Sequence, residues 1–334
     1  MSSKCYIGFD TSNYTTSAAA VLVDERGKIE VIANCKEMLP VAKGERGLRQ
    51  SDALFAHTKN LPAVIGRLRD DIGDVLVCGV GYSDRPRDLA DSYMPVFLSG
   101  RVAAEAYAAA LGVPLYSFSH QNGHIMAALY SSGALDDGLL DRPFFAFHLS
   151  GGTTEAVLVS PNADGEGTRD GFFSSRLLCA TDDINAGQAI DRAGVAMGLK
   201  FPCGKEMELL AKEWTGDIPS MRITVKDGKC NLSGLENKAL ELYRKSGDSR
   251  LVSAFVFSVV GRTVLKMTEY LQAEHADGEP YDVLYAGGVM SNKLMRPLLS
   301  DNKNYKTYFA EPQFSADNAA GVAIMAAMRA ENLR

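Results

Sequence analysis

The sequence lacks several features that would assign it to a large class of proteins. Its 334 residues include one tryptophan and five histidines, and 35 Lys and Arg against 41 Asp and Glu give a net charge of −6. Because there is no basic excess, the chain as a whole does not attract nucleic acid, and any RNA contact needs a local basic patch or a partner. The composition, 46% hydrophobic, excludes a disordered chain and predicts a globular protein with room for two cores.

Paired cysteines, a targeting segment and a long apolar run are also missing. The six cysteines stand singly, without the Cys-x-x-Cys pairs of a zinc ribbon or redox site, so we expect reduced, mostly buried thiols. No apolar stretch with a cleavage site precedes Tyr6–Asp10, which favours a cytoplasmic protein. The densest apolar run, residues 251–261, has 11 residues, whereas a bilayer span needs about 20. We expect a core helix there and no membrane contact.

An internal repeat is the first positive feature. Residues 9–18 align with residues 147–156 at a shift of 138, with five identities, and both segments continue into apolar residues. The pattern predicts a strand, a tight polar turn and a second strand in each copy, although five matches also leave room for two unrelated hairpins. Such turns present N–H and hydroxyl groups that suit phosphate oxygens. Their candidate ligand-binding residues are Ser12 in the first copy and Ser150, Gly151, Gly152 and Thr153 in the second.

Strand-like and helix-like segments alternate in both halves of the chain. Strands are expected at 4–10, 18–23, 29–33, 75–82, 144–149, 155–160, 172–179 and 283–286, and a helix at 100–111. This order predicts a duplicated α/β fold, with mixed sheets covered by helices and a ligand cleft between two lobes. We expect residues 1–128 and 317–334 in the N-terminal lobe and residues 129–316 in the C-terminal lobe, with a helical insertion around 200–247.

Three histidines and one aspartate are candidate metal ligands. His120 and His124 open a predicted helix with a spacing of four, which places both imidazoles on one face; two surface histidines are the alternative. Asp317 precedes an alanine-rich helix, where it could bind the metal or cap the helix. His148 ends the strand before the second turn, where a buried histidine bonded to a backbone carbonyl is the alternative.

A Gly-Gly turn follows the predicted strand at 283–286. Gly287 and Gly288 would let the backbone approach a ligand, and Asn292 could cap the next helix or bind a nucleoside hydroxyl. Alone, this pattern has little specificity.

Together these motifs resemble the TsaD family, long labelled O-sialoglycoprotein endopeptidases, within the fold of actin, heat-shock chaperone ATPases and sugar kinases. The resemblance covers nearly the whole chain. Its strongest pieces are His120-x-x-x-His124, Leu149-Ser150-Gly151-Gly152, Thr181-Asp182-Asp183, Gly187 to Asp191, Phe201 to Gly204, Ala286 to Val289 with Asn292, and Asp317 to Ala320. The resemblance implies a metal-dependent, nucleotide-binding transferase that moves a threonylcarbamoyl group from its adenylate to a tRNA adenosine beside the anticodon.

The resemblance also implies roles for individual residues. His120, His124 and Asp317 match the family's metal ligands, for iron or zinc, and His148 stands where archaeal members have a metal-coordinating tyrosine. The phosphate-side turn is matched by Ser150, Gly151 and Gly152, and the nucleoside positions by Asp191, Gly204 and Asn292. The implied ligands are one divalent metal and ATP or an acyl-adenylate; tRNA, partner proteins and a second copy of the chain are the other candidate partners.

Several positions depart from the family's pattern. Tyr14 and Thr15 replace an Asp-Glu pair, and Arg85-Pro86-Arg87 replaces a Gly-Pro-Gly turn. If tRNA is the acceptor, the edge from Arg85 to Arg87, the slightly basic helical insertion or a partner would have to hold it. Thr153, Gln188 and Cys203 also differ, and the sequence reveals no general base. The alternatives are therefore a non-catalytic or regulatory nucleotide-binding paralogue, or a carbamoyltransferase or kinase with a small-molecule acceptor. A protease is disfavoured because the histidine motif lacks the glutamate of His-Glu-x-x-His.

Overall fold

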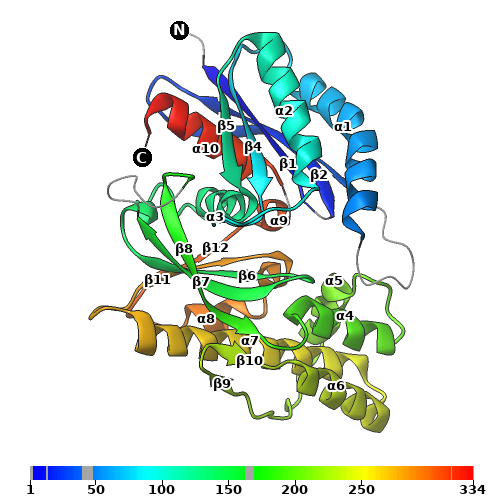
Figure 1. Cartoon of the computed structure of the whole chain (residues 1–334). Coiled ribbons are helices and arrows are strands. Elements are labelled where there is room, and N and C mark those ends of the chain that lie inside the picture. The colour runs from blue at the N-terminus through cyan, green and yellow to red at the C-terminus, as the bar shows by residue number, and fades with distance from the viewer. Residues whose placement is uncertain (1–2, 13, 40–47, 162–168, 317, 334) are drawn as a thin grey trace. The chain divides into compact units, whose positions relative to one another are not determined.

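The computed structural model describes residues 3–12, 14–39, 48–161, 169–316 and 318–333, and the chain divides into two compact units (Figure 1). Unit 1 comprises Met1–Ser131, Pro161–Ser174 and Asp317–Arg334. Unit 2 comprises Ser132–Ser160 and Ser175–Ala316. Each unit contains a mixed β-sheet with helices, as the sequence predicts.

Unit 1 is built on a five-stranded sheet in the order β3-β2-β1-β4-β5. Its strands are β1 (Lys4–Thr11), β2 (Thr15–Val23), β3 (Ile29–Met38), β4 (Val77–Arg85) and β5 (Leu115–Ser119). Strands β1, β2 and β3 are antiparallel neighbours, whereas β4 and β5 run parallel to β1. The helices of this unit are α1 (Gln50–Ile72), α2 (Phe97–Leu111), α3 (His120–Ser131) and α10 (Ala320–Glu331).

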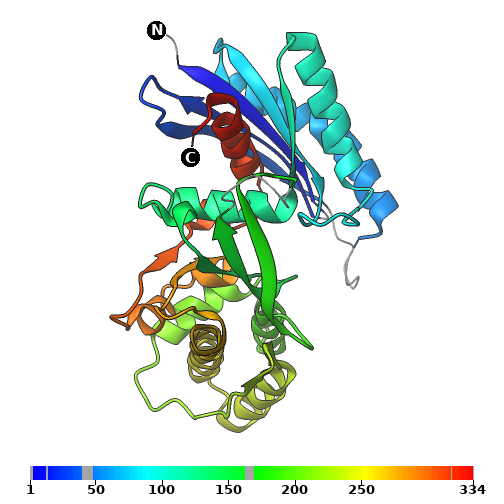
Figure 2. The same ribbon diagram turned by 60° about the vertical axis from the view of Figure 1, so that its left-hand side comes forward.

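Helices cover both faces of this sheet, with α1 and α2 on one side and α10 on the other (Figures 1 and 2). Because side chains alternate along a strand, Ile7 and Phe9 of β1 join the core beneath α1 and α2. Gly8 faces the other way, and a Cβ there would lie 2.6 Å from the Ala323 nitrogen of α10. Small residues thus bring α10 close to the sheet.

Unit 2 repeats this topology with two strands added. Its sheet runs β12-β11-β6-β7-β8-β10-β9, so the series β8-β7-β6-β11-β12 corresponds to β3-β2-β1-β4-β5 of unit 1. The strands are β6 (Phe144–Leu149), β7 (Thr154–Pro161), β8 (Phe173–Thr181), β9 (Val225–Lys226), β10 (Lys229–Cys230), β11 (Asp282–Ala286) and β12 (Thr307–Phe309). The helices are η1 (Leu139–Asp141), α4 (Ala186–Ala196), α5 (Gly204–Lys212), α6 (Ser233–Ser246), α7 (Ser249–His275), η2 (Gly288–Ser291), α8 (Arg296–Ser300) and α9 (Pro312–Ser315).

The sequence repeat is also a repeat of strand register. In unit 1, Thr11 pairs with Thr16, and in unit 2, Leu149 pairs with Thr154. Both residues of the second pair are displaced by 138 from the first, the same shift that aligns the two sequences. The two hairpins therefore close in the same way, which favours duplication over two unrelated hairpins.

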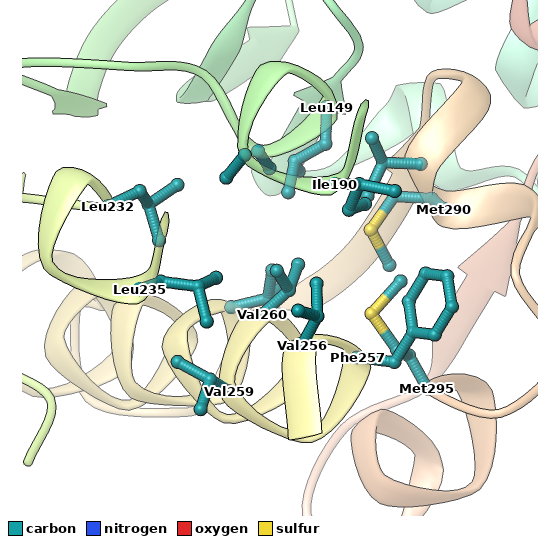
Figure 3. Close-up of a cluster of buried hydrophobic side chains, with 14 of the residues drawn as sticks. Leu149, Ile190, Leu232, Leu235, Val256, Phe257, Val259, Val260, Met290 and Met295 are labelled. Atoms are coloured by element: carbon teal, nitrogen blue, oxygen red, sulfur yellow. The ribbon is translucent and has the colours of Figure 1, made fainter. Parts of the chain in front are cut away.

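Helix α7 forms the centre of the unit 2 core (Figure 3). Val256, Val260 and other apolar residues of α7 pack with Ile190 of α4 and Leu235 of α6. Fully burying such a side chain contributes about 1.5–3 kcal/mol. Among the described residues one helix, α7, is long and apolar enough to cross a membrane, but 72% of its most apolar stretch is buried. The expected core helix is confirmed.

The segment around 200–247 differs from the helical insertion that the sequence predicts. It contains α5 and α6, but residues 213–224 form no helix or strand, and β9 and β10 make a small hairpin. Gly216 and Pro219 disfavour a helix in the first of these stretches. The Asp227-Gly228 turn, with both residues at positive φ, closes the hairpin.

Candidate functional site

Two histidines face each other at the start of α3. Strand β5 ends at Ser119 and α3 begins at His120, so His124 lies one turn further along the same face. Their Nε2 atoms are 3.0 Å apart, and the rings meet edge to face. The buried ring of Phe97 packs beside His120 at 5.7 Å between centroids. Two imidazole nitrogens this close suit a cation that prefers nitrogen ligands, such as zinc or iron.

The other two predicted metal ligands are Asp317 and His148. Asp317 lies outside the described part of the chain. His148 is half-buried near the end of β6 in unit 2. Within the residues described, no group of three His, Cys, Asp or Glu side chains is placed to hold a metal ion. His120 and His124 are therefore the two of the four predicted ligands that the structure places next to each other.

Asp10 contacts this histidine pair, and the sequence does not single it out. It lies near the end of β1 and is 1% exposed. Its Oδ1 is 2.9 Å from His120 Nδ1, the ring nitrogen opposite the one that faces His124. A signal was present in the repeat, because Asp10 aligns with His148 at the shift of 138.

A buried histidine, His57, forms hydrogen bonds with residues on both sides of the first hairpin turn. The Ser12 carbonyl accepts a hydrogen bond from His57 Nε2 at 2.7 Å, so Nδ1 accepts from the Thr16 hydroxyl at 2.8 Å. His57 lies on α1 and has no exposed surface. Burial lowers its pKa below the ordinary value, although the Ser12 carbonyl opposes the shift. This bonding pattern fixes the turn that carries Ser12.

The second turn is closed by its own serine. Ser150 Oγ accepts hydrogen bonds from the backbone N–H groups of Gly152, at 3.3 Å, and Thr153, at 3.1 Å. The Ser150 carbonyl accepts from Gly187 N at the start of α4. Gly187 is required there because a Cβ would lie 2.7 Å from the Gly151 nitrogen. The turn therefore presents two convergent N–H groups beside the start of α4.

The Gly-Gly turn after β11 lies against the end of β6, the strand that leads into the Ser150 turn. A Cβ on Gly287 would lie 2.2 Å from the Leu149 carbonyl oxygen, whereas Gly288 has open space around it. Asn292 is 5% exposed, and its Oδ1 accepts from the N–H groups of Leu294 at 2.9 Å and Met295 at 3.3 Å. Its Nδ2 is buried and has no hydrogen-bond partner in the described part of the chain.

The remaining nucleoside candidates lie where α4 meets α5. Asp191 of α4 accepts a hydrogen bond from Cys203 N at 2.7 Å, which ties α4 to the loop before Gly204. Burial raises the pKa of Asp191, and the bond from Cys203 opposes this shift. The Cys203 side chain is buried against Gly194, where a Cβ would come within 2.3 Å of it. One Asp191 oxygen is thus engaged by the backbone before any ligand binds.

With this geometry established, comparison with known proteins assigns the chain to a family. The TsaD family, described as tRNA N6-adenosine threonylcarbamoyltransferase, matches residues 94–324. The chain belongs to the TsaD family. The match includes the histidine pair and all the candidate glycine turns of unit 2, whereas the first hairpin lies before it.

Full-length relatives agree with this assignment. A TsaD-family protein of Streptococcus pneumoniae, named tRNA N6-adenosine threonylcarbamoyltransferase, is 28% identical over 97% of this chain and 91% of its own length. A protein of Streptococcus mutans with the same name is 30% identical over 70% of this chain and 67% of its own length. The relatives are named as transferases.

Solved structures confirm the fold class. The activator of 2-hydroxyisocaproyl-CoA dehydratase from Clostridium difficile matches 98% of this chain and 96% of its own length, with a TM-score of 0.52 and 13% identity. HypF of T. kodakarensis matches 99% of this chain and 48% of its own length, with a TM-score of 0.55 and 13% identity. The chain has the actin-like and sugar-kinase-like fold that its TsaD motifs imply.

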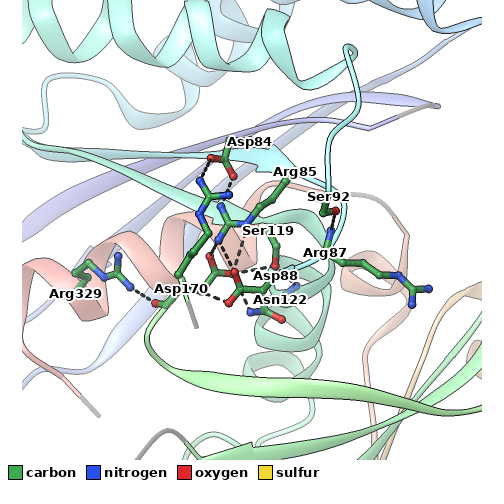
Figure 4. A network of polar contacts seen from close by, with 10 residues as sticks. Asp84, Arg85, Arg87, Asp88, Ser92, Ser119, Asn122, Asp170 and Arg329 are labelled. Carbon is green, nitrogen blue, oxygen red and sulfur yellow. Dashed lines mark hydrogen bonds and ion pairs between the residues drawn. The ribbon is translucent and has the colours of Figure 1, made fainter. Parts of the chain in front are cut away.

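The position of Arg85 corrects one expectation. The sequence suggests that the edge from Arg85 to Arg87 could contact RNA, but Arg85 is 1% exposed, and Figure 4 shows its polar contacts. Its guanidinium pairs with Asp84, Asp88 and Asp170, the Asp88 contact measuring 2.6 Å. Because three carboxylates surround this buried cation, it is not available to an RNA phosphate.

Asp170 lies at the centre of this Arg85 network. Its Oδ2 accepts hydrogen bonds from Ser119 N and Oγ, both at 2.9 Å, and from Asn122 Nδ2 at 2.8 Å. Arg329 of α10 donates to its backbone carbonyl (Figure 4). The network thus joins the segment that carries Asp170 to β4, α3 and α10 of unit 1.

Proposed function

We propose that this chain transfers a threonylcarbamoyl group from threonylcarbamoyl-adenylate to the adenosine beside the anticodon of a tRNA, with one divalent metal ion, zinc or iron. The observation that carries the proposal is the TsaD-family match over residues 94–324, because it contains both the histidine pair and the nucleotide turns. The facing Nε2 atoms of His120 and His124 supply the nitrogen ligands that such an ion needs.

Unit 2 supplies the groups that would bind the adenylate. The N–H groups of Gly152 and Thr153, which donate to Ser150 Oγ, could donate to phosphate oxygens instead. An ionised acceptor makes the stronger hydrogen bond. Asn292 Nδ2 offers a donor to the nucleoside. The Asp191 carboxylate can accept from a ribose hydroxyl through the oxygen that Cys203 does not use.

The reaction requires an exchange at one carbonyl carbon. The adenosine N6 forms a bond to the carbamoyl carbon, the bond from that carbon to the phosphate oxygen breaks, AMP leaves and N6 loses a proton. A divalent metal held by His120, His124, Asp317 and His148 would supply Lewis-acid polarisation of this carbonyl. The turn at Ser150 to Thr153 would orient the phosphate and stabilise its charge as AMP departs.

A transfer assay tests this function directly. Purified chain is incubated with threonylcarbamoyl-adenylate and tRNA, and modified adenosine and AMP are measured by mass spectrometry. We expect equal amounts of both products and their loss in His120→Ala,His124→Ala, with retention in the control His275→Ala. Adenylate binding without any product would identify a regulatory paralogue. Hydrolysis, or transfer to a small acceptor in place of tRNA, would identify a different transferase.

With Arg85 buried, we propose that the irregular segment before β9, together with the β9-β10 hairpin, provides the RNA contact. Arg222, Lys226 and Lys229 line a cavity of about 580 Å³ there. Lys229 pairs with Asp182, whereas neither Arg222 nor Lys226 has an acidic partner among the described residues. The double variant Arg222→Glu,Lys226→Glu should weaken tRNA binding and flatten its salt dependence. Lys238→Glu,Lys245→Glu changes the charge equally at a site paired with Glu241 and is the control.

A further inference from the structure

We propose that Asp10 is a positioning residue of the metal site: its carboxylate holds His120 as the Nδ1–H tautomer and thereby turns the Nε2 lone pair toward the metal. The proposal rests on the metal site of the proposed function and adds a residue from β1, outside the part of the chain that matches the TsaD family.

The first argument is that the two ring nitrogens of His120 contact different partners. Nδ1 lies 2.9 Å from Asp10 Oδ1, and Nε2 lies 3.0 Å from His124 Nε2. An ionised carboxylate only accepts hydrogen bonds, so Nδ1 must carry the proton. In the neutral ring Nε2 then has the lone pair, which is the arrangement that a metal-binding histidine needs.

The second argument is the rigidity of the contact. Asp10 is 1% exposed on a strand that pairs along its length with β2 and from Cys5 to Phe9 with β4. The buried Phe97 ring also packs beside His120. The imidazole therefore contacts both a buried carboxylate and a buried aromatic ring, which limits its rotation.

The third argument is a pair of buried polar atoms near the carboxyl-terminal ends of the neighbouring strands β1 and β4. Asp10 Oδ2 has no hydrogen-bond partner in the described part of the chain, and neither has Ser83 Oγ. The register pairs Phe9 with Tyr82, so Asp10 and Ser83 occupy the next positions on neighbouring strands. Buried polar groups without partners are costly and rare in a merely structural role.

The internal repeat gives the position further meaning. Asp10 pairs with Ser17 across the first hairpin, and His148 pairs with Glu155 across the second, at the same shift of 138. The first repeat thus places a carboxylate where the second repeat places a histidine. We assign the carboxylate to orientation of a ligand and not to the ligand set itself, because its Oδ1 is directed at Nδ1 of His120.

The test combines ring tautomers with metal affinity. Metal-free protein labelled with ¹⁵N-histidine is studied by NMR at pH 8, and Zn²⁺ and Co²⁺ affinities are measured by competition with a chelator. Wild type should show His120 as the Nδ1–H tautomer. Asp10→Leu and Asp10→Ala, which remove the acceptor, should lose this preference and bind both ions 10-fold to 100-fold more weakly. Ser17→Ala, which removes a hydrogen bond to the Asp10 carbonyl and keeps the carboxylate, should match wild type.

The possible results separate this proposal from the proposed function. Unchanged metal affinity in both folded Asp10 variants would overturn the positioning role and leave the metal site intact. Wild-type affinity in His120→Ala,His124→Ala would overturn the metal site itself, and the role of Asp10 with it. Urea unfolding of each variant establishes that the comparison is between folded proteins, and the Co²⁺ absorption spectrum reports whether nitrogen ligation is retained.

Discussion

His57 shows how one buried side chain links the first hairpin turn to the pH of the solution. It has no exposed surface and spans from Thr16 to the Ser12 carbonyl. A protonated ring could still donate to Ser12 but could no longer accept from Thr16. The folded state therefore favours neutral His57, in agreement with its lowered pKa.

The first prediction concerns acid stability. Because the folded pKa of His57 is below the unfolded value of about 6.5, the unfolded state binds the proton first as the pH falls. His57 should therefore lower the free energy of unfolding below about pH 6.5, by up to about 1.4 kcal/mol per pH unit. Urea unfolding between pH 5 and 8 should show this slope in wild type, and His57→Gln, which does not titrate, should remove that part of it. Equal slopes in the two proteins would contradict the assignment.

At the scale of elements, the turn after β11 depends on one of its two glycines. Gly287 has a φ of +94°, and its missing Cβ makes room for the Leu149 carbonyl of β6. Gly288 begins η2 and has no atom within 4 Å of an added Cβ. The two neighbours form a matched pair of sites.

The second prediction uses this pair. Gly287→Ala should lower the free energy of unfolding by about 3 kcal/mol or more, because it combines an unfavourable φ with a backbone collision. Gly288→Ala should change it by about 0.5 kcal/mol or less. Chemical denaturation of both variants provides the measurement. A similar cost at both positions would show that the turn relaxes around a side chain.

The third prediction concerns the crossing of α3 and α10. A Cβ on Gly321 would lie 1.9 Å from the carbonyl oxygen of Gly123. In the sequence, Gly123 lies between His120 and His124. Gly321→Ala should therefore destabilise unit 1 by several kcal/mol. Gly66→Ala, on an exposed position of α1 with open space around it, should instead stabilise the protein by about 1 kcal/mol. Thermal unfolding would distinguish the two directions, and a stable Gly321→Ala protein would refute the close crossing.

At the scale of the molecule, the Arg85 network joins distant parts of the chain. Arg85 of β4 and Asp170 are 85 positions apart, and both are buried. Removing one partner of a buried ion pair leaves an uncompensated charge, which typically costs about 3–5 kcal/mol.

The fourth prediction follows from this network. Arg85→Met should lose about 3–5 kcal/mol of stability, because the buried side chains of Asp88 and Asp170 lose their shared cation. Asp84 also loses Arg85 but keeps its pair with Arg169. The control Arg101→Met removes a half-exposed ion pair with Glu105 on α2 and should cost about 0.5 kcal/mol or less. Denaturant unfolding of both variants measures the difference. Equal costs would mean that the buried pair contributes no more than a surface pair.

The sequence predicts the fold better than the site because the two depend on different distances along the chain. Alternating apolar residues and terminal glycines are local, so the helix expected at 100–111 appears as Phe97–Leu111 with Gly112 in the left-handed conformation. The contact between Asp10 and His120 spans 110 positions, and no local pattern reports it. The same holds for Arg85, whose exposure is removed by Asp170. Predictions fail where a charged residue meets its partner through tertiary structure.

Helix α10 follows all of unit 2 in the chain, yet it packs on β1 and β4 of unit 1. Lys4 at the start of β1 pairs with Glu331 at the end of α10 at 2.7 Å. A ribosome makes β1 before the segments of unit 2 and α10 after them, so one face of the first sheet stays uncovered while unit 2 is synthesised. The unit that is begun first is completed last, after the segments of unit 2 have all emerged. The nascent chain therefore carries an open sheet face, which a chaperone could bind, until α10 has emerged.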